Sequence, residues 1–194
     1  MSYHIYTTDG IILKRTTFGE ANLLLYVITE DFGLIVASAQ AARLSSSKLR
    51  TALQEFSLCS ISCVKGKGGW KITNAVEKEN FFYTCPKFSH KVLYQMVSIL
   101  LKMIPGESPQ PEIFQTIRTG LNHLRSLSQK HLSDFEILLV LRLMYDLGYV
   151  VRSEDLRVFL ENREDWQPTI FEKVSQKKKE IISVINKALK ESHL

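Results

Sequence analysis

Cysteine is scarce in this chain, and long apolar runs are missing. The 194 residues include three cysteines, Cys59, Cys63 and Cys85. An odd number without regular spacing argues against the disulfide framework of a small secreted protein. The first residues lack a charged segment followed by an apolar one, so we expect no signal peptide. No apolar run approaches the roughly 20 residues of a membrane span, and we therefore expect a cytoplasmic protein that does not bind a membrane.

Catalytic and metal-binding patterns are also absent from the sequence. The segment Gly66-Lys67-Gly68-Gly69 lacks the spacing of a phosphate-binding loop and precedes an expected strand instead of a helix. No Gly-x-Ser-x-Gly motif is present, and the five histidines show no ligand spacing. Cys59 and Cys63 would need two further ligands to hold zinc. We expect no enzymatic activity, no cofactor and no metal site.

Positive charge is concentrated in one part of the chain. Residues 35–71 contain six Lys or Arg residues and one acid, Glu55, so this window carries a net charge of +5, equal to that of the whole chain. Residues 85–194 carry +3 over a much longer stretch. A local excess of cations suits a polyanion such as nucleic acid. The alternative is a solvated basic surface without a partner.

The N-terminal part reads as five short strands, expected at residues 3–17, 22–29, 34–39, 56–64 and 70–76. Gly10 inside the first strand suggests a bulge or bend, and Lys65-Gly-Lys-Gly-Gly69 suggests a hairpin turn. A basic, Ser-rich connector and an irregular or helical stretch separate the third and fourth strands. This order favours an OB-like, partly open barrel over residues 1–82. An SH3-like barrel or a plain meander remains possible.

The pattern becomes helical after Cys85-Pro86. Apolar residues recur at helical spacing from Phe88 onward. Ser133-Asp-Phe-Glu136 reads as a capping box that opens a helix ending near Gly148. The fold class expected is therefore α+β, with the barrel followed by an all-helical domain over residues 86–194.

The N-terminal motifs together resemble the first domain of the RecO family of bacterial recombination mediators. They are Gly10-Ile-Ile-Leu-Lys14, the Gly19-Glu20 turn, Thr29 to Leu34, the basic Ala39 to Arg50 stretch, Leu53-Gln-Glu-Phe56, and the glycine-rich hairpin. The order and spacing cover about 70 residues, which makes the resemblance specific. The helix that ends in Leu147-Gly-Tyr149 also resembles the helical domain of this family.

The resemblance implies a set of activities and partners. Such proteins bind single- and double-stranded DNA, anneal complementary strands and work with RecR. They help to load RecA onto strands coated by single-stranded-DNA-binding protein, whose C-terminal tail the helical domain recognises. Function in DNA damage repair implies a cytoplasmic, nucleoid-associated location.

This chain departs from the family pattern at three points. It has no cysteine beyond Cys85, so the four-Cys zinc site of many members is not expected. The usual Ala-Lys-Gly-Ala-Arg is Ala39-Gln-Ala-Ala-Arg43, which removes one cation and places Ala41 where glycine would bend more easily. The chain is also short for the family, so we expect a trimmed helical domain.

The candidate DNA-binding residues lie in the connector, in the hairpin and at the end of the first strand. Flexible cations and small residues suit phosphate contacts. Trp70 could stack on an unpaired base or pack in the core. Phe18, Tyr26 and Phe32 are expected in the core. The candidates are Lys14, Arg15, Arg43, Lys48, Arg50, Lys65, Lys67, Trp70 and Lys71.

Glu20, the final helix and the function as a whole each have a second interpretation. For Glu20 we expect a structural role in its turn, not a catalytic one. The lysine-rich final helix could bind an acidic peptide or pack on its own domain as an amphipathic helix. A protein that kept the fold but only bridges repair proteins is the alternative function.

Overall fold

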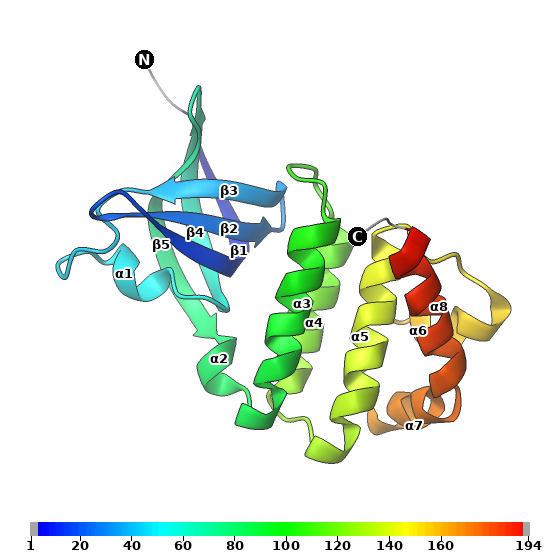
Figure 1. Ribbon diagram of the computed structural model, residues 1–194. Coiled ribbons are helices and arrows are strands. Elements are labelled where there is room, and N and C mark those ends of the chain that lie inside the picture. Colours follow the sequence, from blue (N-terminus) through cyan, green and yellow to red (C-terminus); the bar gives the residue numbers. More distant parts are fainter. Residues whose placement is uncertain (1–3, 192–194) are drawn as a thin grey trace. The chain divides into compact units, whose positions relative to one another are not determined.

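The structure is a computed structural model that describes residues 4–191 and divides into two compact units (Figure 1). The first unit is Met1–Thr84 with Pro105–Pro111, and the second is Cys85–Ile104 with Glu112–Leu194. The loop of residues 105–111 was expected within the helical part, yet its contacts group it with the first unit.

The first unit contains a closed barrel with the strand order β1-β2-β3-β5-β4. Its strands are β1 (Ile5–Phe18), β2 (Asn22–Thr29), β3 (Gly33–Ala39), β4 (Ser57–Gly66) and β5 (Gly69–Asn80). The first strand pairs with both β2 and β4, and the parallel pairing of β3 with β5 completes the ring. The OB-like barrel followed by helices is therefore confirmed, and the β3–β5 pairing rules out a plain meander.

The first strand serves two neighbours because it is long and changes its register once. Gly10 lies opposite both Thr29 and Cys59, and a Cβ added there would stand 2.8 Å from a methyl carbon of Val27. Glycine is thus needed for close packing, while the irregularity falls three residues later, between Ile12 and Lys14. The extra residue lets Leu13 stay buried and turns Lys14 outward.

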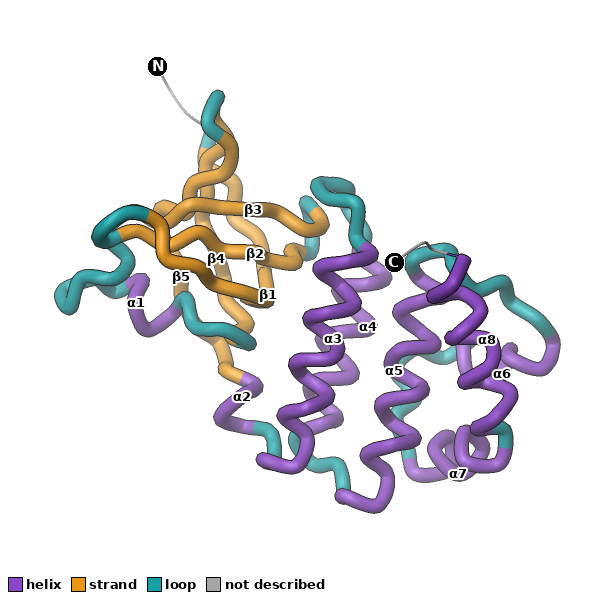
Figure 2. Tube along the Cα trace, viewed as in Figure 1, coloured by secondary structure: helices purple, strands orange, loops and turns teal. Residues whose placement is uncertain are grey.

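The connector between β3 and β4 runs through turns to the short helix α1 (Leu49–Ala52) (Figure 2). Ala41 adopts a φ of 52°, in the left-handed region that glycine favours. Its amide donates a 2.9 Å hydrogen bond to Asn22 Oδ1. The substitution of alanine for glycine therefore does not prevent the bend.

The second unit is helical. It contains α3 (His90–Met103), α4 (Pro111–Leu124), α5 (Leu132–Asp146), α6 (Arg157–Leu160), α7 (Pro168–Gln176) and α8 (Lys178–Glu191); α2 (Phe81–Thr84) closes the first unit. Three 3₁₀ turns lie at Lys87–Ser89, Gln129–His131 and Glu154–Leu156. The central helix is α5, which packs against α6, α7 and α8.

The expected capping box at the start of α5 is wrong. The helix begins at Leu132 with His131 as its N-cap, so Ser133 lies inside the first turn. Its hydroxyl instead accepts a 2.8 Å hydrogen bond from Lys178 Nζ on α8. The preceding 3₁₀ turn runs directly into α5 and moves the helix start ahead of the serine.

Candidate nucleic-acid interface

The outer surface of β2 and β3 carries polar and aliphatic side chains and the aromatic Tyr26 between two basic segments. Lys14 lies opposite Tyr26, and Tyr26 lies opposite Val36. Directly opposed residues share one face of a sheet, and all three side chains are exposed or half-buried. Tyr26 was expected in the core, and that prediction is wrong, because Leu25 and Val27 on either side of it point inward.

A second row runs beside the first. Leu24 lies opposite Thr16 and Ser38, and Ser38 lies beside Lys71 on β5. The row brings Lys71 from the hairpin strand onto the same outer surface as Lys14. In OB-folds the face of strands 2 and 3, with the β1–β2 and β4–β5 loops, is where oligonucleotides bind.

The β1–β2 turn and the connector form one end of this surface. The Arg43 amide donates to the carbonyl of Ala21 at 2.9 Å, and Arg43 Nη1 donates to the main-chain carbonyl of Glu20 at 2.8 Å. The Glu20 atom in this contact belongs to the main chain, so the structural role expected for its side chain stays a prediction. Phe18, expected in the core, is 58% exposed beside this turn, so that expectation is wrong.

The remaining cations of this end differ in whether other protein groups already bind them. Arg15 donates from Nη1 to Gln54 Oε1 at 2.7 Å, and its amide donates to Glu55. Within residues 4–191, Lys48 and Arg50 have exposed side chains without an ion-pair partner. Arg15 and Arg43 thus hold the local structure, whereas Lys48 and Arg50 are available to a ligand.

The β4–β5 hairpin forms the other end. Lys67 lies at its exposed tip, and no ion partner for Lys67 or Lys71 occurs in the described part of the chain. Lys65 differs, because its Nζ lies 2.5 Å from Glu107 Oε2. The hydrogen bond from Lys65 is the main reason why the pKa of Glu107 is lowered.

Trp70 does not offer an open ring for stacking. It is 4% exposed, and its ring lies 5.6 Å from Tyr6 and 5.0 Å from Phe32 between centroids. Lys65 Nζ lies 5.2 Å from its ring centroid. The structure thus places Trp70 in the core, with Phe32 packed against it as expected, and the stacking role predicted for Trp70 is wrong.

The thiols of β4 are core groups. Cys59 and Cys63 are both completely buried, and Cys59 Sγ donates to the carbonyl of Ala52 at 3.1 Å. Burial raises the pKa of Cys59 to about 12 and that of Cys63 to about 11. Across residues 4–191, no three His, Cys, Asp or Glu side chains gather closely enough to hold a metal ion.

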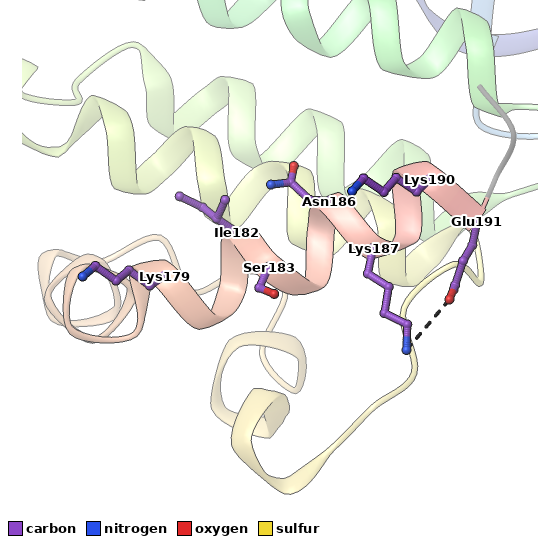
Figure 3. A pocket seen from close by; sticks show the side chains of 7 residues that line it. All are labelled: Lys179, Ile182, Ser183, Asn186, Lys187, Lys190 and Glu191. Carbon is purple, nitrogen blue, oxygen red and sulfur yellow. Dashed lines mark ion pairs between the residues drawn. The ribbon is translucent and has the colours of Figure 1, made fainter.

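The final helix shows a different basic surface. Ile181 and Ile185 bury one face of α8, which packs against α5. An open groove runs along its other side, lined by Lys179, Ile182, Ser183, Asn186, Lys187, Lys190 and Glu191 (Figure 3). Lys187 pairs with Glu191 at 3.8 Å. The helix is thus amphipathic and packed on its own unit, with lysines facing solvent.

In the part of the chain that the structure describes, no helix could cross a membrane.

Comparisons with known proteins agree with the barrel. The family model described as "Recombination protein O N terminal" matches residues 1–81. A DNA repair protein RecO from Synechococcus elongatus is 47% identical over 126 residues, which are 63% of this chain and 47% of that protein.

Other relatives give the same result at lower identity. RecO from Gloeothece citriformis is 30% identical over 64% of this chain and 44% of its own length, and RecO from Dehalococcoides mccartyi strain 195 is 29% identical over 66% and 51%. The chain spans about half the length of the curated relatives it matches. The strand order of the barrel and these matches show that residues 1–81 form a barrel of the RecO N-terminal type and that the chain is similar to RecO proteins.

Proposed function

We propose that the barrel binds single-stranded DNA across the outer face of β2 and β3. The observation that carries this proposal is the row formed by Lys14, Tyr26 and Val36, which lies between the cationic connector and the cationic hairpin. Cations at both ends can contact successive phosphates, and Tyr26 between them can stack on a base. Duplex DNA would use the same cations without the tyrosine, since its bases are already stacked.

The free cations would contact the DNA strand at three places on the barrel. Lys67 and Lys71 contact phosphates at the hairpin end, Lys14 contacts them beside Tyr26, and Lys48 and Arg50 contact them at the connector. Lys48 and Lys67 lie on turns that can adjust to the ligand, whereas Lys14 and Lys71 lie on strands that fix their spacing. Arg15 and Arg43 support the connector, because protein groups already hold their guanidinium groups.

On this basis the chain is a DNA-repair mediator in the cytoplasm, associated with the nucleoid. It anneals complementary strands and helps to load a RecA recombinase, in company with a RecR-type mediator and a single-stranded-DNA-binding protein. The similarity to proteins named DNA repair protein RecO supports this role. The free cations would supply the contact with DNA. No catalytic group is required, because binding energy alone can drive the exchange of strands between partners.

An annealing assay tests this function directly. Two complementary labelled oligonucleotides should anneal faster with the protein than without it. A variant with Lys14, Lys67 and Lys71 changed to alanine should lose most of this acceleration. The matched control changes Lys91, Lys102 and Lys130, three exposed lysines of the helical unit, to alanine and should keep it. Equal loss in both variants would contradict the assigned face.

The alternative is an adapter that bridges repair proteins without useful DNA affinity. It is favoured by the internal use of Lys65, Arg15 and Arg43, each of which already binds a protein group. Capture of a partner repair protein with and without nuclease separates the two functions. A partner retained after nuclease treatment, by a protein that does not anneal DNA, would favour the adapter.

A further inference from the structure

The Lys65–Glu107 ion pair joins two segments 42 residues apart at the candidate DNA surface. Its distance is 2.5 Å, and the side chains of Lys65 and Glu107 remain 53% and 40% exposed. In the described part of the chain, Lys65 is the one lysine of the hairpin that has a carboxylate partner. Solvent, and a ligand in it, can therefore reach both members of the pair.

Close packing on the β2–β3 turn fixes the loop that carries Glu107. Gly33, with a φ of 69°, faces the loop so tightly that a Cβ would stand 2.0 Å from the carbonyl oxygen of Ser108. The loop belongs to the same compact unit as the hairpin. The packing of Ser108 against Gly33 therefore fixes the backbone next to Glu107 and keeps its carboxylate within reach of Lys65.

The contact resembles the one that Lys65 would make with DNA. A lysine ammonium donates to carboxylate and phosphate oxygens alike, as a point charge. The pKa of Glu107 is lowered, so this group is an anion at neutral pH. A phosphate that approaches Lys65 meets a carboxylate already bound there, which both occupies the cation and repels the phosphate.

We propose that Glu107 is an internal competitor of the nucleic-acid backbone, which holds Lys65 in the free protein and leaves it when DNA binds the hairpin. The inference rests on the proposed DNA-binding function and assigns a role to a residue outside the binding face. The loop of residues 105–111 thus lowers the affinity of the barrel for DNA through the charge of Glu107. Removing that charge should strengthen DNA binding.

The test compares binding of a labelled dT20 oligonucleotide to four variants of the full chain. E107Q keeps the shape of the side chain and removes its charge, so it should bind about two- to fivefold more tightly than the wild type. The gain should shrink as the salt concentration rises, because salt screens the exposed Lys65–Glu107 pair that the wild type must break. E172Q, which removes an exposed carboxylate from α7, controls for net charge and should change little.

The remaining two variants show whether the effect passes through Lys65. K65A should weaken binding, and adding E107Q to K65A should give much less gain than E107Q alone. A full gain in the K65A background would overturn the inference, because Glu107 would then act by general repulsion. If the wild type binds DNA and E107Q matches E172Q, the inference fails while the proposed function stands. If no variant binds, both fail.

Hydrogen exchange gives a second measurement that does not depend on affinity changes. On addition of dT20, the amides of Gly106, Glu107, Ser108 and Gln110, which are the loop residues with an N–H group, should exchange faster, since the carboxylate leaves its partner and the loop loses one tether. Unchanged or slower exchange in this loop, at a DNA concentration that saturates the protein, would contradict displacement.

Discussion

Lys14 and Tyr26 lie directly opposite each other on β1 and β2, and both side chains face away from the barrel core. The bulge between Ile12 and Lys14 produces this pairing, because it buries Leu13 and reverses the side on which the next residue emerges. A cation beside an aromatic ring can bind single-stranded DNA, because the cation can contact a phosphate while the ring stacks on a neighbouring base.

Tyr26→Ala should weaken single-strand binding by about 1–3 kcal/mol, the usual value of one base–aromatic stack. Tyr26→Phe should bind nearly as well as the wild type, because the ring is kept. Tyr149→Ala, at a 37% exposed tyrosine of the helical unit, provides the control. Fluorescence anisotropy with a labelled oligonucleotide measures all three, and equal affinity of Tyr26→Ala and wild type would remove Tyr26 from the site.

Ala41→Gly should stabilise the protein. Alanine at a φ of 52° pays a steric cost that glycine avoids, and the greater entropy of glycine in the unfolded chain offsets part of the gain. The net increase in the free energy of unfolding should be on the order of 0.5–1 kcal/mol. Urea denaturation measures it; Ala52→Gly, inside α1, should destabilise instead. A loss of stability in Ala41→Gly would contradict the strain.

Arg142→Leu should destabilise the protein strongly. The buried guanidinium donates to the carbonyls of Phe159, Asn162, Arg163 and Asp165 at 2.9–3.0 Å and lies 4.3 Å from the ring centroid of Trp166. Its removal takes this donor from all four carbonyls at a cost of about 3–5 kcal/mol, although the carbonyl of Asn162 keeps a 3.2 Å hydrogen bond from the Asp165 amide. Arg152→Leu, which removes a half-exposed pair with Glu161, should cost less than about 1 kcal/mol in the same denaturation experiment. Similar costs would show that the carbonyl cluster is not essential.

Stability should fall as the pH drops below about 6.5, partly because of His123. Burial lowers the pKa of His123 from its ordinary value of 6.5, against the opposing charge of Asp165. The unfolded chain therefore takes up the proton first, so the contribution of His123 is complete above pH 6.5 and is lost as the pH falls towards the lowered value. His123→Gln should reduce the difference in unfolding free energy between pH 7.5 and 5.5, and the exposed His4→Gln should not. An unchanged difference in His123→Gln would contradict this contribution.

The barrel could be predicted from the sequence because its strands are short, apolar and separated by turn residues. The expected range for β2 matches the observed strand, Asn22–Thr29, and the hairpin turn lies where its glycines suggested. The side on which each residue points could not be predicted in the same way. Strand periodicity fixes the inward side only when the position of a bulge is known.

The aromatic residues show the consequence most clearly. Trp70 was open between base stacking and core packing, and the structure places it in the core; Tyr26 was predicted in the core, and it lies half-buried on the outer face. The alternation Leu23, Leu25, Val27 already marks Tyr26 as outward, which is the signal that could have found it. The pairing of Lys65 with Glu107 had no such signal, because the two residues are distant in the chain.

The most direct test of the DNA-binding face is the salt dependence of single-strand binding. With the five free cations and the released Lys65 on phosphates, the log of affinity should fall with the log of salt at a slope of roughly −4. Changing Lys14, Lys67 and Lys71 to alanine should make that slope shallower by about 2, and changing Lys91, Lys102 and Lys130 should leave it unchanged. A slope unaffected by the first variant, or no binding by the wild type at low salt, would contradict the assignment of this face to DNA.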